Sequence, residues 1–399
     1  MFGRRWGLVA ALALAATGFG GGSAHAQAAP AVQHSRGGVY HVAVCPGPAN
    51  AGTARCHAHV VTDAAGNPIV SNANTGPSGY WPADLQSAYA VNTSGGAGVT
   101  VAIVDAYGYP NAEADLATYR QRFGLPACTT ANGCFRKVNQ NGVQGSYPRA
   151  DTGWSQESAL DLDMVSAMCP NCKIVLVEAN SNSYANLATA VRTAANLGAH
   201  VISNSYGGGE SGSNSYETSY NQPGVAVTVS TGDSGYGVQF PASSDHVVAV
   251  GGTSLKQAVN ARGWTETVWS GAGSGCSAVY NQPSWQSGVV SDCAKRALAD
   301  VSAVADPNTG VAVYGPVTPK RSGWMVFGGT SVSAPLVGGL YGLNGGSVNY
   351  GSDPYGATGA LNDVTSGSNG SCGGSALCTA KQGWDGPTGL GTPIDSTAF

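Results

Sequence analysis

The chain has 399 residues, of which 42% are hydrophobic and 10% charged, and its formal net charge is −4 at pH 7. This length permits one large α/β domain with a substantial core. The small net charge and the lack of a basic run argue against a nucleic-acid binder. The 59 glycines and the sparse charge indicate a compact, loop-rich extracellular protein.

Residues 1–26 have the pattern of a secretory signal peptide. Two arginines precede the apolar run "WGLVAALALAATGF", and "AHA" at 24–26 is a small-residue cleavage motif. A membrane anchor is the alternative, but the run is short and ends in glycines. No later segment is long and apolar enough to span a bilayer. The sequence therefore predicts a secreted, extracellular protein without a membrane partner.

Ten cysteines in an exported chain favour disulfides. They occur in five close pairs, so pairing of sequence neighbours is expected, although spacing alone leaves the connectivity open. The pairs are Cys45 and Cys56, Cys128 and Cys134, Cys169 and Cys172, Cys276 and Cys293, and Cys372 and Cys378. The motif "CPNC" at 169–172 also suggests a redox or zinc site. It follows an expected helix and precedes an expected strand, the reverse of the thioredoxin order, and no second CxxC motif exists. We expect a structural disulfide there.

Residues 27–76 are polar and show few apolar periodicities, which indicates a short N-terminal extension or a reduced pro-segment. Residues 77–399 have the regular pattern of one domain. Apolar runs predict buried parallel strands at 99–107, 173–179, 200–207, 225–232 and 247–254. Helical stretches lie between several of them, at 111–124, 155–168 and 183–198. This alternation predicts an α/β fold with a mostly parallel central sheet and helices on both faces.

The stretch "GGTSVSAPLVGGLYGLN" at 328–344 places Ser331 where a strand or loop passes into a helix. Gly329 gives the turn conformational freedom, and the apolar spacing after Pro335 is helical. Pro335 is expected in the first turn, where its missing N–H costs little. Free backbone N–H groups at a helix start stabilise an anion, so Ser331 is a candidate nucleophile.

A nucleophilic serine normally needs a base that accepts its proton. Five of the seven histidines precede residue 60, and His200 and His246 lie beside expected strands. None has the helix-start context "HGT" that a subtilase would show. We therefore expect that no histidine acts as the base for Ser331.

Glu157 and Asp161 in "SQESALDLD" are four residues apart, so they share one face of the predicted helix, whereas Asp163 should point elsewhere. Two carboxyl groups in contact share a proton and titrate as a unit. Such a pair accepts a serine proton at acid pH, where an imidazole is already protonated. A solvated acidic helix face is the alternative.

Asp233 lies in "STGDSGYG" at 230–237, a Gly-flanked turn that follows an expected strand. Ligands meet open parallel sheets at such strand ends. An ordinary turn aspartate is the alternative.

Taken in chain order, Glu157, Asp161, Asp233 and Ser331 resemble the catalytic motifs of the sedolisins, the serine-carboxyl peptidases with a subtilisin-like three-layer fold. The resemblance runs from "WPADLQSAY" at 81–89 to "GWDGPTGLGTP" at 383–393. It implies that Ser331 is the nucleophile, Glu157 the general base and later acid, and Asp161 the group that orients Glu157. Asp233 would be protonated and would donate to the oxyanion, because an ionised carboxylate there would repel the developing charge. The resemblance implies an acid-acting endopeptidase that takes protein or peptide substrates.

The resemblance also implies one structural Ca²⁺ ion, in "LNDVTSG" (361–367) and "KQGWDG" (381–386). Its ligands would be the side chains of Asp363 and Asp385 and the carbonyl oxygens of Val364 and Gly383, which are ligands that suit calcium. Lys381 stands where the family usually has a glycine that supplies a carbonyl, so its part in the site stays open. Two ordinary surface-loop aspartates are the alternative.

The chain departs from the family at its N-terminus, because relatives carry a long inhibitory prodomain where this chain has only residues 27–76. Either residues 27–76 perform a reduced version of this inhibitory role, or this protein matures in a different way. Similar peptidases also pair the extended substrate with the edge formed here by "SNSYGGG" at 203–209.

Other functions stay open at this point. Asp105, in "VAIVDAYG", has the strand-end context of a subtilase aspartate. We interpret it as a structural or supporting residue, but a neutral-pH subtilase that uses Asp105 and an unrecognised histidine is an alternative. A catalytically silent binding protein with the same scaffold is another. A monomer is expected.

Overall fold

The computed structural model describes residues 1–3, 31–34, 38–71, 76–345 and 348–399. The predicted signal peptide, apart from its first three residues, lies outside the described residues. Within the described part of the chain, no helix has the length and apolar character needed to cross a membrane.

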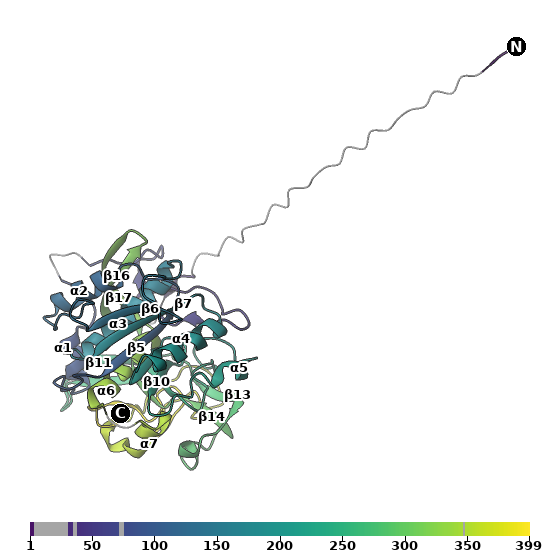
Figure 1. Ribbon diagram of the computed structural model, residues 1–399. Helices are drawn as coiled ribbons and strands as arrows, with labels where there is room; N and C mark the ends of the chain where they lie inside the picture. The colour runs from purple at the N-terminus through teal and green to yellow at the C-terminus, as the bar shows by residue number, and fades with distance from the viewer. Residues whose placement is uncertain (4–30, 35–37, 72–75, 346–347) are drawn as a thin grey trace.

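A central sheet of eight strands organises the domain (Figure 1). In spatial order its strands are β12 (Trp264–Val268), β11 (Val248–Gln257), β10 (Ala226–Ser230), β8 (Val201–Asn204), β5 (Thr100–Ala106), β7 (Lys173–Ala179) and β6 (Phe135–Asn139), with β15 (Val301–Val304) beside β11. Every pairing is parallel except that of β11 with β12. The mostly parallel sheet confirms the predicted fold class.

Helices cover both faces of this sheet (Figure 1). They are α1 (Pro82–Ala88), α2 (Ala112–Arg122), α3 (Thr152–Met168), α4 (Tyr184–Asn196) and α6 (Thr330–Asn344). Val101 and Ile103 of β5 pack in one core cluster with residues of α3 and α6. Ala102 and Val104 pack in another cluster with residues of α4. The strand is buried on both sides, which explains why its sequence is a continuous apolar run.

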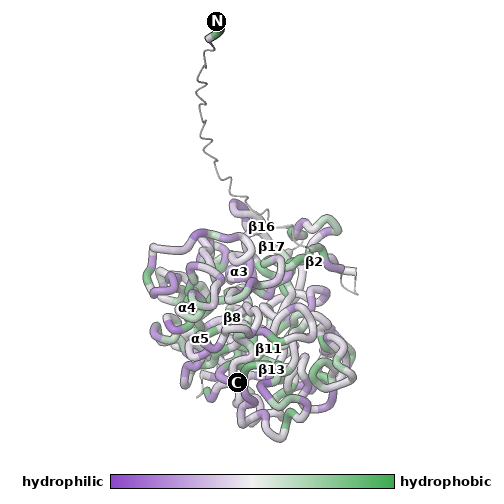
Figure 2. Tube along the Cα trace, turned by 90° about the vertical axis from the view of Figure 1, so that its right-hand side faces the viewer, coloured by the Kyte–Doolittle hydropathy of each residue, from purple (hydrophilic) through white to green (hydrophobic). Residues whose placement is uncertain are grey.

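A second, antiparallel sheet joins residues 33–62 to residues 311–328. Its strands, in spatial order, are β1 (Gln33–His34), β2 (Tyr40–Ala43), β4 (His59–Thr62), β17 (Arg321–Gly328) and β16 (Val311–Thr318). Val60 pairs with Phe327, and His59 with Gly328. Figure 2 shows β2 beside β16 and β17. Part of the segment interpreted from sequence as an N-terminal extension is therefore built into the domain.

Short elements complete the fold. The remaining strand pairs are β3 (Arg55–Cys56) with β9 (Tyr206–Gly207), β13 (Gly275–Asn281) with β14 (Lys295–Leu298), and β18 (Leu361–Asn362) with β19 (Thr392–Pro393), and two short helices are α5 (Asn214–Glu217) and α7 (Asp353–Gly356).

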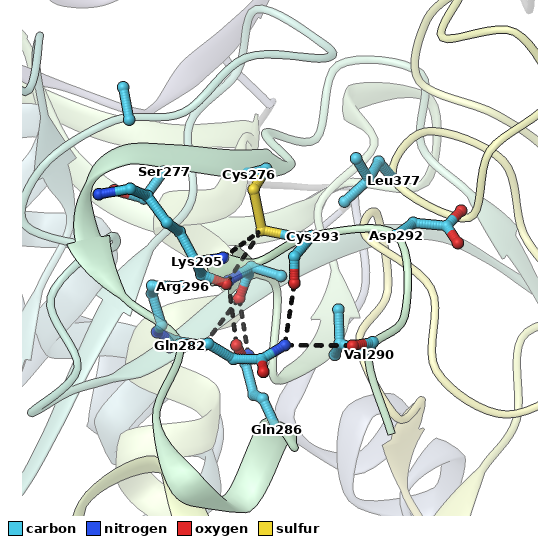
Figure 3. Close-up of a disulfide and its surroundings, with 12 residues drawn as sticks. Cys276, Ser277, Gln282, Gln286, Val290, Asp292, Cys293, Lys295, Arg296 and Leu377 are labelled. Carbon is cyan, nitrogen blue, oxygen red and sulfur yellow. Dashed lines mark hydrogen bonds between the residues drawn. A yellow bond between two sulfur atoms is a disulfide. The ribbon is translucent and has the colours of Figure 1, made fainter. Parts of the chain in front are cut away.

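All ten cysteines form disulfides, in the five pairs expected from sequence. Cys169 and Cys172 connect the end of α3 to the start of β7, so "CPNC" is a structural disulfide. Figure 3 shows the Cys276–Cys293 bridge, beside which the Gln282 side chain donates hydrogen bonds to the carbonyl oxygens of Val290 (3.1 Å) and Cys293 (2.9 Å).

Helix α6 begins earlier than the sequence suggests. It starts at Thr330, so Pro335 lies inside the helix, beyond the first turn where it was predicted. The prediction was wrong because it took the proline as the start signal, whereas Gly329 ends the preceding turn with a φ of 101°. Ser331 is therefore the second residue of the helix.

Candidate active site

The buried start of α6 positions Ser331. Its Oγ donates a hydrogen bond to the Ser205 carbonyl oxygen at 3.3 Å. Its backbone N–H points to the carbonyl oxygen of His57 at an N···O distance of 3.4 Å. Strand β17 ends at Gly328, and Gly329, whose φ is positive, forms the turn into helix α6. The nucleophile candidate thus lies at a rigid junction of strand and helix.

Helix α3 carries Glu157 and Asp161, and both are fully buried. The Asp151 side chain caps this helix by accepting from the Trp154 N–H at 3.0 Å. Asp163 turns away, as expected, and accepts from the Tyr314 N–H at 2.9 Å. The burial of the pair excludes a solvated acidic face.

Burial is the main cause that raises the pKa of Glu157, and the charges of Asp161 and Asp105 raise that pKa further. The nearby Ser331 hydroxyl opposes this rise, although in this structure its hydrogen bond goes to Ser205. Burial also raises the pKa of Asp161, whose Oδ1 accepts from the Ser205 Oγ at 2.7 Å. Neither Glu157 oxygen accepts a hydrogen bond from any described residue, Asp161 included. The pair is therefore disposed to hold a proton.

Asp105, near the end of β5, is a third buried carboxyl group beside this pair. Burial raises its pKa to about 7, with a further contribution from Glu178, while Ser158 opposes the rise. Neither carboxyl oxygen of Asp105 has a hydrogen-bond partner among the described residues, histidines included. This arrangement does not supply the histidine that a neutral-pH subtilase would need.

Asp233 lies in the loop after β10 and reaches the start of α6. Its Oδ1 accepts hydrogen bonds from the N–H and Oγ1 of Thr330, at 2.8 and 2.7 Å. Its Oδ2 has no hydrogen-bond partner among the described residues and lies 3.5 Å from Nε2 of His59. Burial raises the pKa of Asp233 to about 7, against the lowering effect of Thr330. Below that pH the group carries a proton that it can donate.

The sequence analysis missed the histidines of the N-terminal segment. His57 is buried in the site, where its Nδ1 lies 2.7 Å from Ser230 Oγ and its Nε2 lies 2.9 Å from Gln239 Oε1. Both ring nitrogens are thus engaged away from Ser331. The short alternation in "CHAHVV" at 56–61 was the signal of a strand here.

A cavity of about 800 Å³ opens beside Asp233. Its lining includes Asp233 together with His41, Arg55, Ser254 and Trp269. Its volume lies in the range of ligand-binding clefts and it adjoins a buried acid of raised pKa, which makes it a candidate binding site.

The two loops predicted to hold calcium also lie together. The Gly383 N–H donates to Asp363 Oδ2 at 2.8 Å. Asp385 is buried, and burial together with the nearby Asp363 raises its pKa to about 7. The Lys381 N–H faces Asp385 Oδ2 at 3.2 Å, while the Lys381 charge acts on Asp292. Two carboxyl groups that lie near enough to raise the pKa of Asp385 have the oxygen chemistry that suits a Ca²⁺ ion.

The fold and the buried carboxyls beside a helix-start serine define a subtilisin-like peptidase. The subtilase family model matches residues 138–345. Kumamolisin of Bacillus sp. (strain MN-32) is 30% identical over 387 residues, which cover 86% of this chain and 67% of that protein. Sedolisin of Pseudomonas sp. (strain 101) is 27% identical over 358 residues, covering 79% of this chain and 60% of sedolisin.

A solved structure of Pseudomonas sedolisin, a serine-carboxyl proteinase complexed with two molecules of pseudo-iodotyrostatin, matches with a TM-score of 0.67 and 27% identity. The match covers 80% of this chain and 96% of that one. The chain belongs to the sedolisin family and is a serine-carboxyl peptidase. It spans between three fifths and about two thirds of the length of sedolisin and kumamolisin.

Proposed function

We propose that the protein is a secreted serine endopeptidase that works in acid, through an acyl-enzyme on Ser331. The observation that carries the proposal is the group of buried carboxyls next to Ser331, which takes the place that an imidazole holds in other serine peptidases. Strongly raised pKa values in such a site are typical of catalytic groups.

The reaction begins when Ser331 Oγ attacks the substrate carbonyl carbon and its proton passes to Glu157. In the reacting state Asp161, whose Oδ1 accepts from the Ser205 hydroxyl, carries a proton that it donates to Glu157, and this orients the Glu157 carboxylate. Glu157 then protonates the leaving amine, the peptide C–N bond breaks, and the acyl-enzyme remains. Water attacks the ester with Glu157 again as base, which releases the acid and restores Ser331.

The oxyanion of each tetrahedral intermediate needs donors. The Ser331 N–H is one, and the protonated Asp233 is proposed as the other. Because the pKa of Asp233 is about 7, this group is a donor below that pH and a repelling anion above it. Activity should therefore fall as the pH rises through neutrality.

A calcium ion would be held by the carboxylates of Asp363 and Asp385 and the carbonyl oxygens of Val364 and Gly383. When bound, it supplies positive charge that neutralises two close carboxylates and braces the C-terminal loops. Its role is structural, because these loops are separate from the groups that carry the proposed reaction.

Hydrolysis of a denatured protein at pH 4 by wild-type protein and Ser331→Ala tests the proposal. We expect internal fragments from the wild type and a loss of turnover of about 10³-fold or more in the variant. Mass spectrometry of the products separates internal cuts from the release of terminal peptides. Equal melting temperatures show that the variant is folded. Equal turnover by both proteins would contradict the proposal.

A further inference from the structure

The loop that carries Asp233, residues 231–237 or the aspartate loop, is held by a second loop, residues 271–274 or the support loop. Three backbone hydrogen bonds of 2.7 to 2.8 Å join the two loops, from the Gly235 N–H to the Gly271 oxygen, from the Gly273 N–H to the Gly232 oxygen and from the Gly237 N–H to the Ser274 oxygen. A Cβ placed on Gly273 would lie only 2.1 Å from the Thr231 carbonyl oxygen, so the loops touch at backbone distance. The support loop therefore fixes the path of the chain on both sides of Asp233.

Asn369 contacts both loops. Its carbonyl oxygen accepts from the Tyr236 N–H at 2.9 Å, and a Cβ placed on Gly235 would lie 2.5 Å from that oxygen. Its side-chain Nδ2 donates to the Ala272 carbonyl oxygen at 2.6 Å and to Ser274 Oγ at 2.7 Å. The residue is buried, and both hydrogens of its amide are used in these bonds. One asparagine thus holds the aspartate loop by its backbone and the support loop by its side chain.

Asn369 is itself anchored in the C-terminal part of the chain. Its N–H donates to the Cys378 carbonyl oxygen at 3.1 Å, and Cys378 forms a disulfide with Cys372. Ser274 Oγ, which accepts from Asn369, donates in turn to the Leu377 carbonyl oxygen at 2.6 Å. The cross-linked segment therefore braces Asn369 and the support loop together.

Asp233 is sensitive to its position because only one of its carboxyl oxygens is held. Oδ1 accepts from Thr330, whereas Oδ2 has no hydrogen-bond partner within the described residues. The charged or titratable groups that face Asp233 are His59 of β4, Arg55 of β3 and Glu157 of α3. Burial outweighs the lowering effects of Thr330 and Arg55 and raises the pKa of Asp233 to about 7. Water that reached a displaced Asp233 would lower this pKa.

We propose that Asn369 is a positioning residue of the peptidase, which clamps the aspartate loop so that Asp233 stays buried at the start of α6 as a hydrogen-bond donor. The inference rests on the proposed function, because Asn369 acts through Asp233 and touches no reacting atom. Without the amide, the Ala272 carbonyl and the Ser274 hydroxyl lose their donor, and the two loops separate more easily. The oxyanion donor is then misplaced, and it also loses its proton at a lower pH.

The first test compares peptide hydrolysis by wild type and Asn369→Ala from pH 2.5 to 8, with active-site titration to count the competent molecules. We expect kcat to fall about tenfold to a hundredfold while KM changes little. We also expect the alkaline limb of the profile to move about one pH unit towards acid, because the pKa of Asp233 falls. An alkaline limb shared by wild type and Asn369→Ala would overturn the inference and leave the proposed function in place.

Asn139→Ala is the matched control. Asn139 is also buried, and its side chain also holds a turn, with Nδ2 donating to the Ser146 carbonyl oxygen at 2.8 Å. It ends β6, and three strands of the central sheet lie between β6 and β10. Its alkaline limb should coincide with that of wild type, even where its melting temperature falls. A limb displaced equally in both variants would assign the effect to lost stability and contradict the clamp.

Two further variants test the route through Asp233. Asp233→Asn has no proton to lose, so adding Asn369→Ala to it should lower kcat without moving the pH profile; a moved profile would contradict the route. Ser274→Ala removes one acceptor of the clamp and should give a smaller shift towards acid, and an unmoved limb there would overturn the inference even if Asn369→Ala failed to fold. A wild type that is inert at every pH would instead remove the proposed function and this inference together.

Discussion

Two regions of this protein bury acids in opposite ways. Asp300 lies between the end of β14 and the start of β15, and Arg296 donates to its Oδ1 at 2.7 Å and to its Oδ2 at 2.5 Å. The Ala249 N–H adds a third hydrogen bond, at 2.8 Å. Glu157, beside Ser331, is equally buried but has no hydrogen bond from a described residue.

The difference separates an acid that serves the structure from an acid that is available for chemistry. Asp300 is paired with the buried guanidinium of Arg296, so its hydrogen bonds hold the fold together. The carboxyls around Glu157 repel one another and are raised in pKa, so they exchange protons instead. A buried acid without a partner marks a site where local stability has been given up for function.

The largest expected effect comes from Glu157→Gln, because an amide cannot accept the serine proton. We predict a fall in kcat/KM of about 10³-fold or more at pH 4. Stability should not fall, since the change removes a buried acid that has no cation. Peptide hydrolysis and urea unfolding measure the two quantities. A loss of activity below tenfold would remove Glu157 from the role of base.

Asp300→Asn should lower stability and leave activity nearly unchanged, the reverse of what we predict for Glu157→Gln. Removing one partner of a buried pair leaves the Arg296 charge uncompensated, so the free energy of unfolding should fall by about 3–5 kcal/mol. Activity per folded molecule should stay near that of the wild type. Denaturant unfolding and active-site titration separate the two. A stable but inactive variant would contradict the structural role.

Asp233→Asn keeps a hydrogen-bond donor and removes the need for a proton. We predict that it retains part of the activity and extends it to higher pH, whereas Asp233→Ala loses about 10²–10³-fold. Profiles of kcat against pH for both variants check this. If Asn and Ala behave alike, with an unchanged pH range, Asp233 is only a turn residue.

The stability of the protein should depend on pH in a direction set by the raised pKa values. Carboxyls that are harder to ionise when folded favour the folded state below their usual pKa, near 4, and this contribution is lost as the pH rises through the folded values. For Asp105 and Asp233 those values are about 7. The melting temperature of Ser331→Ala should therefore decline between pH 4 and 8, and it should decline less when Asp233→Asn is added. A melting temperature that rises between pH 4 and 8 would contradict the raised pKa values.

The smallest effect concerns the C-terminal loops. A chelator should lower the melting temperature by a few degrees, because calcium binds the native state. Asp385→Ala should have a lower melting temperature from the outset and should respond little to chelation. An unchanged wild-type melting temperature, with no calcium found by elemental analysis, would count against the site.

The sequence predicted best what depends on local pattern. The run at 173–179 coincides with β7, because a strand buried on both faces is continuously apolar. The spacing of Glu157 and Asp161 likewise placed both on one helix. The strand-end context of Asp105 indicated a structural or supporting residue, but its position beside this pair depends on how β5 packs against α3, which no local pattern contains.

The N-terminal segment was predicted least well. Strands β2 and β4 are short and contain His41 and His59, so their pattern resembles a polar loop. Their pairing with β17 joins segments far apart in the chain, and strand propensity depends strongly on such context. The same long-range pairing brings His57 to Ser331.

The central claim, that carboxyl groups accept the Ser331 proton in place of an imidazole, is tested most directly by kcat/KM of the wild type from pH 2.5 to 8. The account predicts high values in acid and a fall as the pH rises through about 7, where Asp233 loses its proton. Values that rise through pH 6–7 to a plateau above neutrality would indicate a histidine base and contradict the account.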